Sequence, residues 1–161
     1  MEKFTFFWRT NSPFSQWHPC KFVIDEIKFN SAEQYMMFKK ALLFKDDEIA
    51  EKILASSQAP EQKALGRQVK GFDKTIWESE CKNIVYDANY AKFTQNPKLK
   101  EKLLETEGTT IVEASPYDCI WGIGLGEEDP EHFDRSKWKG KNWLGEILTQ
   151  VRDDIMRLEA K

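Results

Sequence analysis

The spacing of hydrophobic and polar positions changes after about the first thirty residues of the chain. Short apolar runs at residues 4–8, 22–24 and 27–29 are typical of β-strands. Asp25-Glu26 separates the second run from the third by two residues, and this spacing predicts a tight hairpin. Beyond residue 30, helix-capping residues and longer segments with apolar positions indicate mainly helical structure.

Capping residues, prolines and glycines predict where the helices begin and end. Asn30 and Ser31 are both good N-cap residues. Glu33 lies three residues after Asn30, and Gln34 lies three residues after Ser31, so either pair can form a capping box. Helices are predicted over about residues 32–44, 60–69, 74–93, 97–107 and 143–158, and a strand over 111–114. A further helix, capped by Asp46 or Asp47, is predicted to run to about residue 54. Ile76 is among the positions expected in the core. A small sheet beside separate helices predicts an α+β fold, mainly helical, in a single domain over residues 1–161.

Composition adds two constraints. Aromatic residues make up 13% of the chain, more than packing alone need use, so some can serve a binding cleft or a partner surface. The formal net charge of −3 disfavours a protein that binds nucleic acid through general electrostatics, although a local basic patch is compatible with it. The oligomeric state stays open at this point.

The sequence indicates neither a metal centre nor a membrane segment. Cys20, Cys81 and Cys119 lack CxxC spacing, and with only His18 and His132 beside them they form no zinc pattern. No apolar stretch approaches the about 20 residues that cross a membrane, and the N-terminus is unlike a secretory signal. We therefore expect a reduced, cytoplasmic protein without a metal.

An unusual polar pair lies on the first predicted helix. Glu33 and Lys40 are seven residues apart and therefore share nearly the same helical face, two turns or roughly 10 Å from each other. A substrate could bridge a carboxylate and an ammonium at this separation. The alternative is that Glu33 closes the capping box and Lys40 is a solvated surface residue.

The segment from Glu113 to Gly124 carries the most information. Glu113 and Asp118 lie at a strand end and in the following loop, beside Trp121 and several glycines. Loops at strand ends often display functional groups, and glycine allows close approach of backbone to a ligand. The glycine spacing at 122–126 does not match a dinucleotide-binding motif. A structural turn with a capping Asp118 is the alternative.

Two further groups could bind a phosphorylated ligand. Arg67 and Lys70 precede Trp77, and a basic residue beside an aromatic ring can hold a phosphate and stack a base. A surface arginine and a core tryptophan would produce the same pattern. Asn142 is a natural N-cap of the last helix, whose N-terminus could also bind an anion.

Taken together and in order, these segments resemble the YbiA-like NADAR domain family. The motifs that carry the resemblance are SPFSQW (12–17), FNSAEQYMMFKKA (29–41), LGR (65–67), YAKF (90–93), VEASPYDCIWGIG (112–124) and WKGKNWLG (138–145). Their order and spacing cover nearly the whole chain. One departure is visible, because the family commonly has Asn where this chain has Gln16.

The resemblance implies an N-glycosidase that hydrolyses ribosylamino-pyrimidine phosphates, early intermediates of riboflavin biosynthesis, and releases ribose 5-phosphate. This reaction is expected to need no metal or organic cofactor. Glu33 matches the family glutamate and is the leading catalytic residue, with Asp118 as a second carboxylate that positions water or the sugar. The expected substrate-binding residues are Lys40 and Arg67 for the phosphate, Trp77 and Trp121 for the base, Asn142 for the ribose diol, Trp8 or Phe14 for closing the pocket, and Glu113.

Two other functions stay open. Some family members resemble hydrolases that remove ADP-ribose from guanine in DNA. Only this hypothesis gives the protein a nucleic-acid partner. A non-catalytic module that binds ADP-ribose or a related nucleotide is the other. Glu33 favours catalysis, because a binding module need not keep a carboxylate beside the anomeric carbon.

Overall fold

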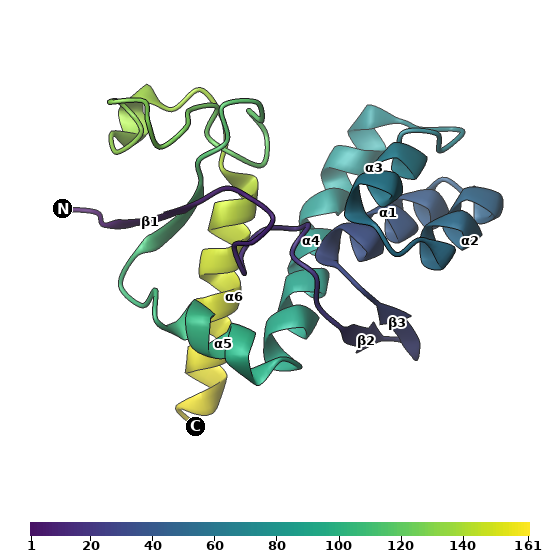
Figure 1. Cartoon of the computed structure of the whole chain (residues 1–161), viewed down its shortest axis with the longest axis horizontal. Helices are drawn as coiled ribbons and strands as arrows, with labels where there is room; N and C mark the ends of the chain where they lie inside the picture. Colours follow the sequence, from purple (N-terminus) through teal and green to yellow (C-terminus); the bar gives the residue numbers. More distant parts are fainter. The chain divides into compact units, whose positions relative to one another are not determined.

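The strands pair as two separate sheets of two strands each. β1 (Phe4–Phe7) runs parallel to β4 (Thr110–Glu113), and β2 (Phe22–Ile24) runs antiparallel to β3 (Ile27–Phe29) (Figure 1). The computed structural model describes all 161 residues. They divide into a terminal unit, residues 1–15 and 98–161, and a central unit, residues 16–97, and each is described by itself.

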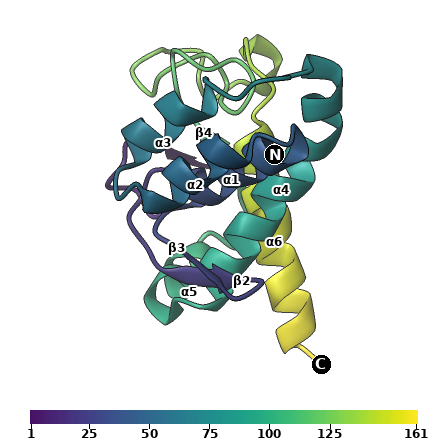
Figure 2. The same ribbon diagram turned by 90° about the vertical axis from the view of Figure 1, so that its right-hand side faces the viewer.

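The central unit contains the β2–β3 hairpin and four helices. Asp25 (φ 53°) and Glu26 (φ 69°) both take the left-handed conformation that a two-residue hairpin turn requires, so the predicted hairpin is confirmed. The helices are α1 (Ala32–Leu43), α2 (Asp47–Ala55), α3 (Ala59–Gly66) and α4 (Lys74–Thr94). α1 packs against the other three (Figure 2), and most of its residues are buried for this reason.

Close packing of α1 and α3 depends on a glycine. A Cβ added to Gly66 would lie 2.0 Å from the Sδ atom of Met37. Gly66 therefore lets the last turn of α3 approach α1 and places Arg67, the next residue, beside the C-terminal half of α1.

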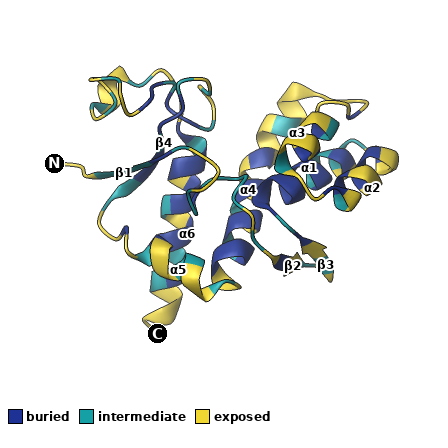
Figure 3. Cartoon of the chain, viewed as in Figure 1, coloured by how far each residue is buried: buried dark blue, intermediate teal, exposed yellow.

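The terminal unit is built around the β1–β4 pair. α5 (Pro97–Leu104) starts at the boundary residue, a short 3₁₀ helix covers Arg135–Lys137, and α6 (Trp143–Glu159) packs against β4. Figure 3 shows the buried face of α6 and its exposed C-terminal end. The core of this unit joins buried and partly buried side chains of the strands and the loop that follows β4, namely Val112, Ile123, Leu125, Phe4, Phe6 and Trp138.

The predicted elements agree with the structure in kind and order, and the α+β class is confirmed. Three details are wrong. The third helix ends at Gly66 rather than near residue 69, and the fifth ends at Leu104 rather than near residue 107. Ile76 is 46% exposed. Ile76 lies in the first turn of α4, whose buried positions begin only at Cys81. The single domain over residues 1–161 stays a prediction. None of the helices combines the length and apolar character needed to cross a membrane.

We expect Gly145→Ala to destabilise the terminal unit by about 1–3 kcal/mol, the usual cost of overpacking a filled interior. An added Cβ would lie 2.1 Å from the carbonyl oxygen of Ile111, a backbone atom of β4 that cannot rotate away. Thermal unfolding followed by circular dichroism measures the effect. Gln150→Ala, on the exposed side of the same helix, is the control and should leave Tm nearly unchanged.

Candidate functional site

Glu33 lies in the first turn of α1 and is 7% exposed. Its backbone N–H donates to the carbonyl oxygen of Gln16 at 3.0 Å. The capping role expected as the alternative for Glu33 is filled by its neighbour, because the N–H of Gln34 donates to the Ser31 hydroxyl and the Gln34 side chain accepts from the N–H of Asn30. The buried Glu33 carboxylate is therefore not the group that closes the helix end.

Lys40 lies on the same face of α1, as the spacing predicted. Its ammonium lies 4.7 Å from the ring centroid of Phe72 and 5.7 Å from that of Trp77. Burial lowers the pKa of Lys40, the Glu33 carboxylate opposes that shift, and the Arg67 guanidinium adds to it. Glu33, Lys40, Arg67 and Trp77 thus form one electrostatic and aromatic group within the central unit.

Exposure differs among these four side chains. Lys40 and Trp77 are half-buried and Arg67 is exposed, whereas Glu33 is buried. Lys40 is partly solvated, and two aromatic rings lie beside its ammonium. Arg67 is a surface residue, as its alternative stated, but one close enough to influence the lysine.

Phe72 is a member of this group that the sequence analysis missed. It is 46% exposed, and its ring packs on Phe44 with centroids 5.4 Å apart. Gly71 turns the chain with φ +76° before it, and Asp73 caps α4 after it by accepting from the N–H of Ile76. An aromatic residue between a glycine and a capping aspartate was the available signal, since such a loop presents its middle side chain.

In the terminal unit, Asp118 organises the loop after β4. Its Oδ1 accepts from the backbone N–H groups of Ile120 (2.9 Å) and Trp121 (2.8 Å). This is the capping turn given above as the alternative for Asp118. The turn holds Trp121 against Trp143 in an edge-to-face contact with centroids 5.6 Å apart, and Asp118 thereby determines where the tryptophan lies.

Glu113 reaches the same loop from the end of β4. A Cβ added to Gly122 would lie 2.7 Å from Oε2 of Glu113, so the glycine makes room for this carboxylate. The Oε2 atom is buried. The Lys141 ammonium lies 5.1 Å over the ring of Trp143, which adds a cation to the group.

Asn142 is fully buried and left-handed, with φ 54°. Its Oδ1 accepts from the N–H of Glu113 at 3.0 Å, and its Nδ2 donates to the carbonyl of Ile111 at 3.1 Å. It occupies the N-cap position of α6, but its side chain makes no capping bond. These contacts tie α6 to β4, and the ribose contact expected of Asn142 stays a prediction.

Two backbone amides at the N-terminus of α6 already have acceptors in the loop after β4. The N–H groups of Trp143 and Leu144 donate to the carbonyl oxygens of Ile120 and Trp121, both at 3.1 Å. The loop after β4 thus engages the amides of Trp143 and Leu144, and anion binding at this helix end stays a prediction.

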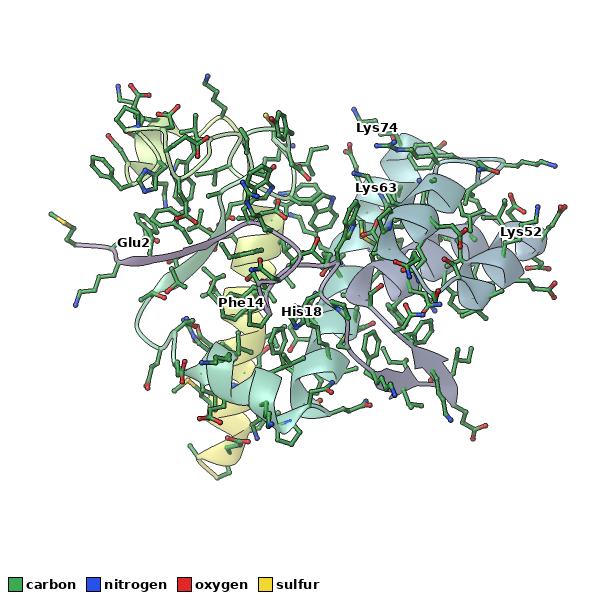
Figure 4. The ribbon with its side chains drawn as sticks, in the orientation of Figure 1. Glu2, Phe14, His18, Lys52, Lys63 and Lys74 are labelled. Atoms are coloured by element: carbon green, nitrogen blue, oxygen red, sulfur yellow. The ribbon has the colours of Figure 1, made fainter.

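Trp8 and Phe14 differ in exposure. Phe14, labelled in Figure 4, is 8% exposed and packs edge-on against Phe7. Trp8 is half-buried between the exposed ring of Tyr117, 5.9 Å away, and the Arg9 guanidinium, 5.3 Å away. Phe14 is thus a core residue of the terminal unit, and Trp8 keeps an accessible aromatic surface. That either closes a pocket stays a prediction.

The predicted site residues fall into two groups, one in each unit. The central group holds Glu33, Lys40, Arg67 and Trp77, and the terminal group holds Trp8, Phe14, Glu113, Asp118, Trp121 and Asn142. A base held between Trp77 and Trp121 stays a prediction, because the two rings belong to different units. No group of three or more His, Cys, Asp or Glu side chains is arranged to hold a metal ion.

A family model for the NADAR domain matches residues 6–156. The chain belongs to the NADAR domain family. A protein of Acanthamoeba polyphaga mimivirus that is named an N-glycosidase is 43% identical over 164 residues, covering 95% of this chain and 96% of that protein. The expected family is thereby confirmed, and so is its enzyme class, hydrolases of N-glycosyl bonds.

Two further NADAR similarities bear on substrate and fold. The chloroplastic riboflavin biosynthesis protein PYRR of Zea mays is 38% identical over 62% of this chain, a match that covers 15% of the maize protein. The NMR structure of Escherichia coli YbiA matches with a TM-score of 0.82 at 25% identity, over 100% of this chain and 90% of that one. This likeness confirms the fold.

Proposed function

We propose that this NADAR protein hydrolyses the C–N glycosidic bond of ribosylamino-pyrimidine phosphates and releases ribose 5-phosphate. The observation that carries the proposal is the central group, in which a buried carboxylate, two cations and two accessible aromatic rings lie together. The name of the maize relative supports a substrate from riboflavin biosynthesis.

Glu33 is the catalytic residue in this proposal. Hydrolysis breaks the bond between the ribose C1′ and the nitrogen, and it forms a bond between C1′ and a water oxygen. Positive charge develops on the ribose ring on the way, and a carboxylate beside it stabilises that charge. Glu33 accepts a proton from the water, and the leaving nitrogen receives that proton as the amine departs.

Lys40 and Arg67 bind the phosphate. Lys40 is partly desolvated against two aromatic rings, so its ammonium is poorly hydrated and an incoming phosphate need not strip away a full water shell. Arg67 supplies the planar fork that suits two phosphate oxygens, and its exposure leaves it accessible.

Phe72 and Trp77 form the wall for the leaving pyrimidine. Both rings contact the Lys40 ammonium and both keep accessible surface. Stacking on an aromatic ring is tolerant of the base, so these residues contribute affinity rather than strict choice. Trp121, held by the Asp118 turn, belongs to the terminal unit, and its contact with the base stays a prediction.

An assay of released sugar tests the function. The protein is incubated separately with ribosylamino-pyrimidine phosphate, with DNA carrying ADP-ribosylated guanine, and with ADP-ribose. Release of ribose 5-phosphate from the first substrate supports the proposal. Release of ADP-ribose from the DNA alone would assign the protein to DNA repair of that modification, and binding of ADP-ribose without any release would identify a non-catalytic module.

We expect the KM for the phosphorylated substrate to rise with pH earlier than an ordinary lysine would allow. The lysine must be protonated to bind phosphate, and the pKa of Lys40 is lowered by burial and by Arg67, so its charge disappears at lower pH. In Lys40→Arg the guanidinium stays protonated, and the rise should vanish from the measurable range. KM measured against pH gives the result.

Lys52→Arg is the matched control for this pH profile, because Lys52 lies on α2 with its side chain 55% exposed, pairs with Glu48, and is not needed for the phosphate site proposed here. Its profile should follow the wild type. An unchanged rise of KM in Lys40→Arg would remove Lys40 from the phosphate site.

A further inference from the structure

Gln16, the first residue of the central unit, joins two helices through three contacts. Its backbone carbonyl accepts the N–H of Glu33 at 3.0 Å. Its side-chain Nε2 lies 3.8 Å from the Sδ of Met36, one turn along α1. Its Oε1 accepts from Nδ2 of Asn89 on α4 at 2.8 Å. The main chain and side chain of Gln16 are therefore both fixed beside the first turns of α1.

Asn89 holds this arrangement from the buried side. The residue is fully buried, and its Nδ2 donates both to Gln16 and to the carbonyl of Val85, one turn earlier on α4. Its Oδ1 is buried and accepts no hydrogen bond from a protein donor. Burying an acceptor in this way opposes folding, and a nonpolar side chain would avoid that penalty. Stability alone therefore does not account for an asparagine here.

We propose that Gln16 and Asn89 are positioning residues that fix the direction of the Glu33 carboxylate. This inference rests on the proposed function, because it assigns Glu33 the catalytic role. Asn89 fixes the Gln16 side chain, and Gln16 in turn holds its carbonyl where the N–H of Glu33 can donate. Neither residue needs to touch substrate.

The position of Glu33 on α1 explains why it needs such support. The first N–H groups of a helix have no partner within the helix, and the first turn frays when they stay unpaired. Ser31 satisfies the N–H of Gln34, and Gln16 satisfies that of Glu33. Without Gln16 the N–H of Glu33 would lose its partner, and small displacements of a catalytic group reduce the rate strongly.

The positioning of Glu33 also depends on the length of the Gln16 side chain. Gln16 is one methylene longer than asparagine, and this length spans the gap between its backbone beside α1 and the Asn89 amide on α4. Gln16→Asn keeps the amide and the backbone carbonyl but withdraws the side chain from Asn89. Gln16→Asn therefore removes the hydrogen bond between Gln16 and Asn89 with little change in polarity.

The experiment compares Asn89→Ala and Gln16→Asn with the wild type. We expect kcat for ribose 5-phosphate release to fall by about ten- to a hundredfold, with KM nearly unchanged, because phosphate and base contacts are intact. The double variant should lose no more activity than the stronger single variant, because both substitutions remove the same hydrogen bond between Gln16 and Asn89. Asn96→Ala is the control. Its side chain bonds the carbonyls of Lys21 and Lys92, so it should affect Tm without a specific loss of kcat.

A second measurement keeps this inference separate from the proposed function. Hydrogen exchange of the Glu33 amide should be faster in Asn89→Ala than in the wild type and unchanged in Asn96→Ala. Faster exchange in Asn89→Ala, together with an inactive wild type, would refute the proposed function but still support the positioning of Glu33 by Gln16 and Asn89. Wild-type kcat in both folded variants, or unchanged exchange at Glu33, would show that Gln16 and Asn89 do not position Glu33. If Asn89→Ala does not fold, Gln16→Asn alone decides.

Discussion

Replacing Glu33 with glutamine is expected to reduce kcat for ribose 5-phosphate release by about 10²- to 10⁴-fold, the contribution typical of a positioned general base. The amide cannot accept a proton from water and carries no charge to oppose the cationic ribose. Stability should change little, because Ser31 and Gln34 rather than Glu33 complete the cap of α1. Steady-state kinetics and a thermal melt measure the two quantities.

The same substitution has a second signature in the pH profile. The Glu33 carboxylate raises the pKa of Lys40 against the effect of burial. Its removal lowers that pKa further, so the rise of KM should begin at still lower pH than in the wild type. This shift would show that the carboxylate and the ammonium share one site, independently of the loss of kcat.

Glu51→Gln serves as the control for charge removal, because Glu51 is an exposed residue of α2. It should leave kcat and the pH profile unchanged. Near wild-type turnover by Glu33→Gln, in a protein that melts normally, would show that another group performs the catalysis.

Much of the fold could be predicted because its signals are local. Ser31 and Asp73 cap the helices that they precede, and the left-handed pair Asp25-Glu26 makes the hairpin. Such features depend on residues only a few positions apart, so one sequence contains them in full. The end of α3 was placed about three residues too late, because Arg67, its C-cap, keeps helical backbone angles and gives no local stop signal.

The candidate site was harder to predict because its roles depend on distant contacts. The spacing of Glu33 and Lys40 revealed a shared face, but not that Phe72 and Trp77 cover the lysine. The link between Gln16 and Asn89 joins residues 73 positions apart, and nothing in either segment indicates the other. Family resemblance supplied Glu33, whereas the surroundings of Glu33 required three-dimensional structure.

Asn142 shows most clearly how burial changes the interpretation of a motif residue. Its place before α6 predicted a cap and the resemblance implied a ribose ligand, whereas the structure shows its two side-chain atoms bonded to the backbone of β4. A ligand contact and a structural bond make opposite demands on the same amide. The two roles therefore give different experimental results.

We expect Asn142→Ala to lower the free energy of unfolding by about 2–6 kcal/mol. The partly buried N–H of Glu113 and the buried carbonyl of Ile111 would each lose a partner, at about 1–3 kcal/mol apiece. Alanine also tolerates the left-handed backbone of position 142 poorly. Chemical denaturation followed by circular dichroism measures the loss.

Two further variants of Asn142 separate these causes. Asn142→Gly adopts the left-handed backbone freely, so it should be more stable than Asn142→Ala while still lacking both side-chain bonds. Asn142→Asp keeps an acceptor for Glu113 but cannot donate to Ile111, and it buries a charge, so it should also be destabilised. If all three variants instead melted like the wild type and showed only a raised KM, Asn142 would be a substrate ligand, and the link between α6 and β4 would depend on other contacts.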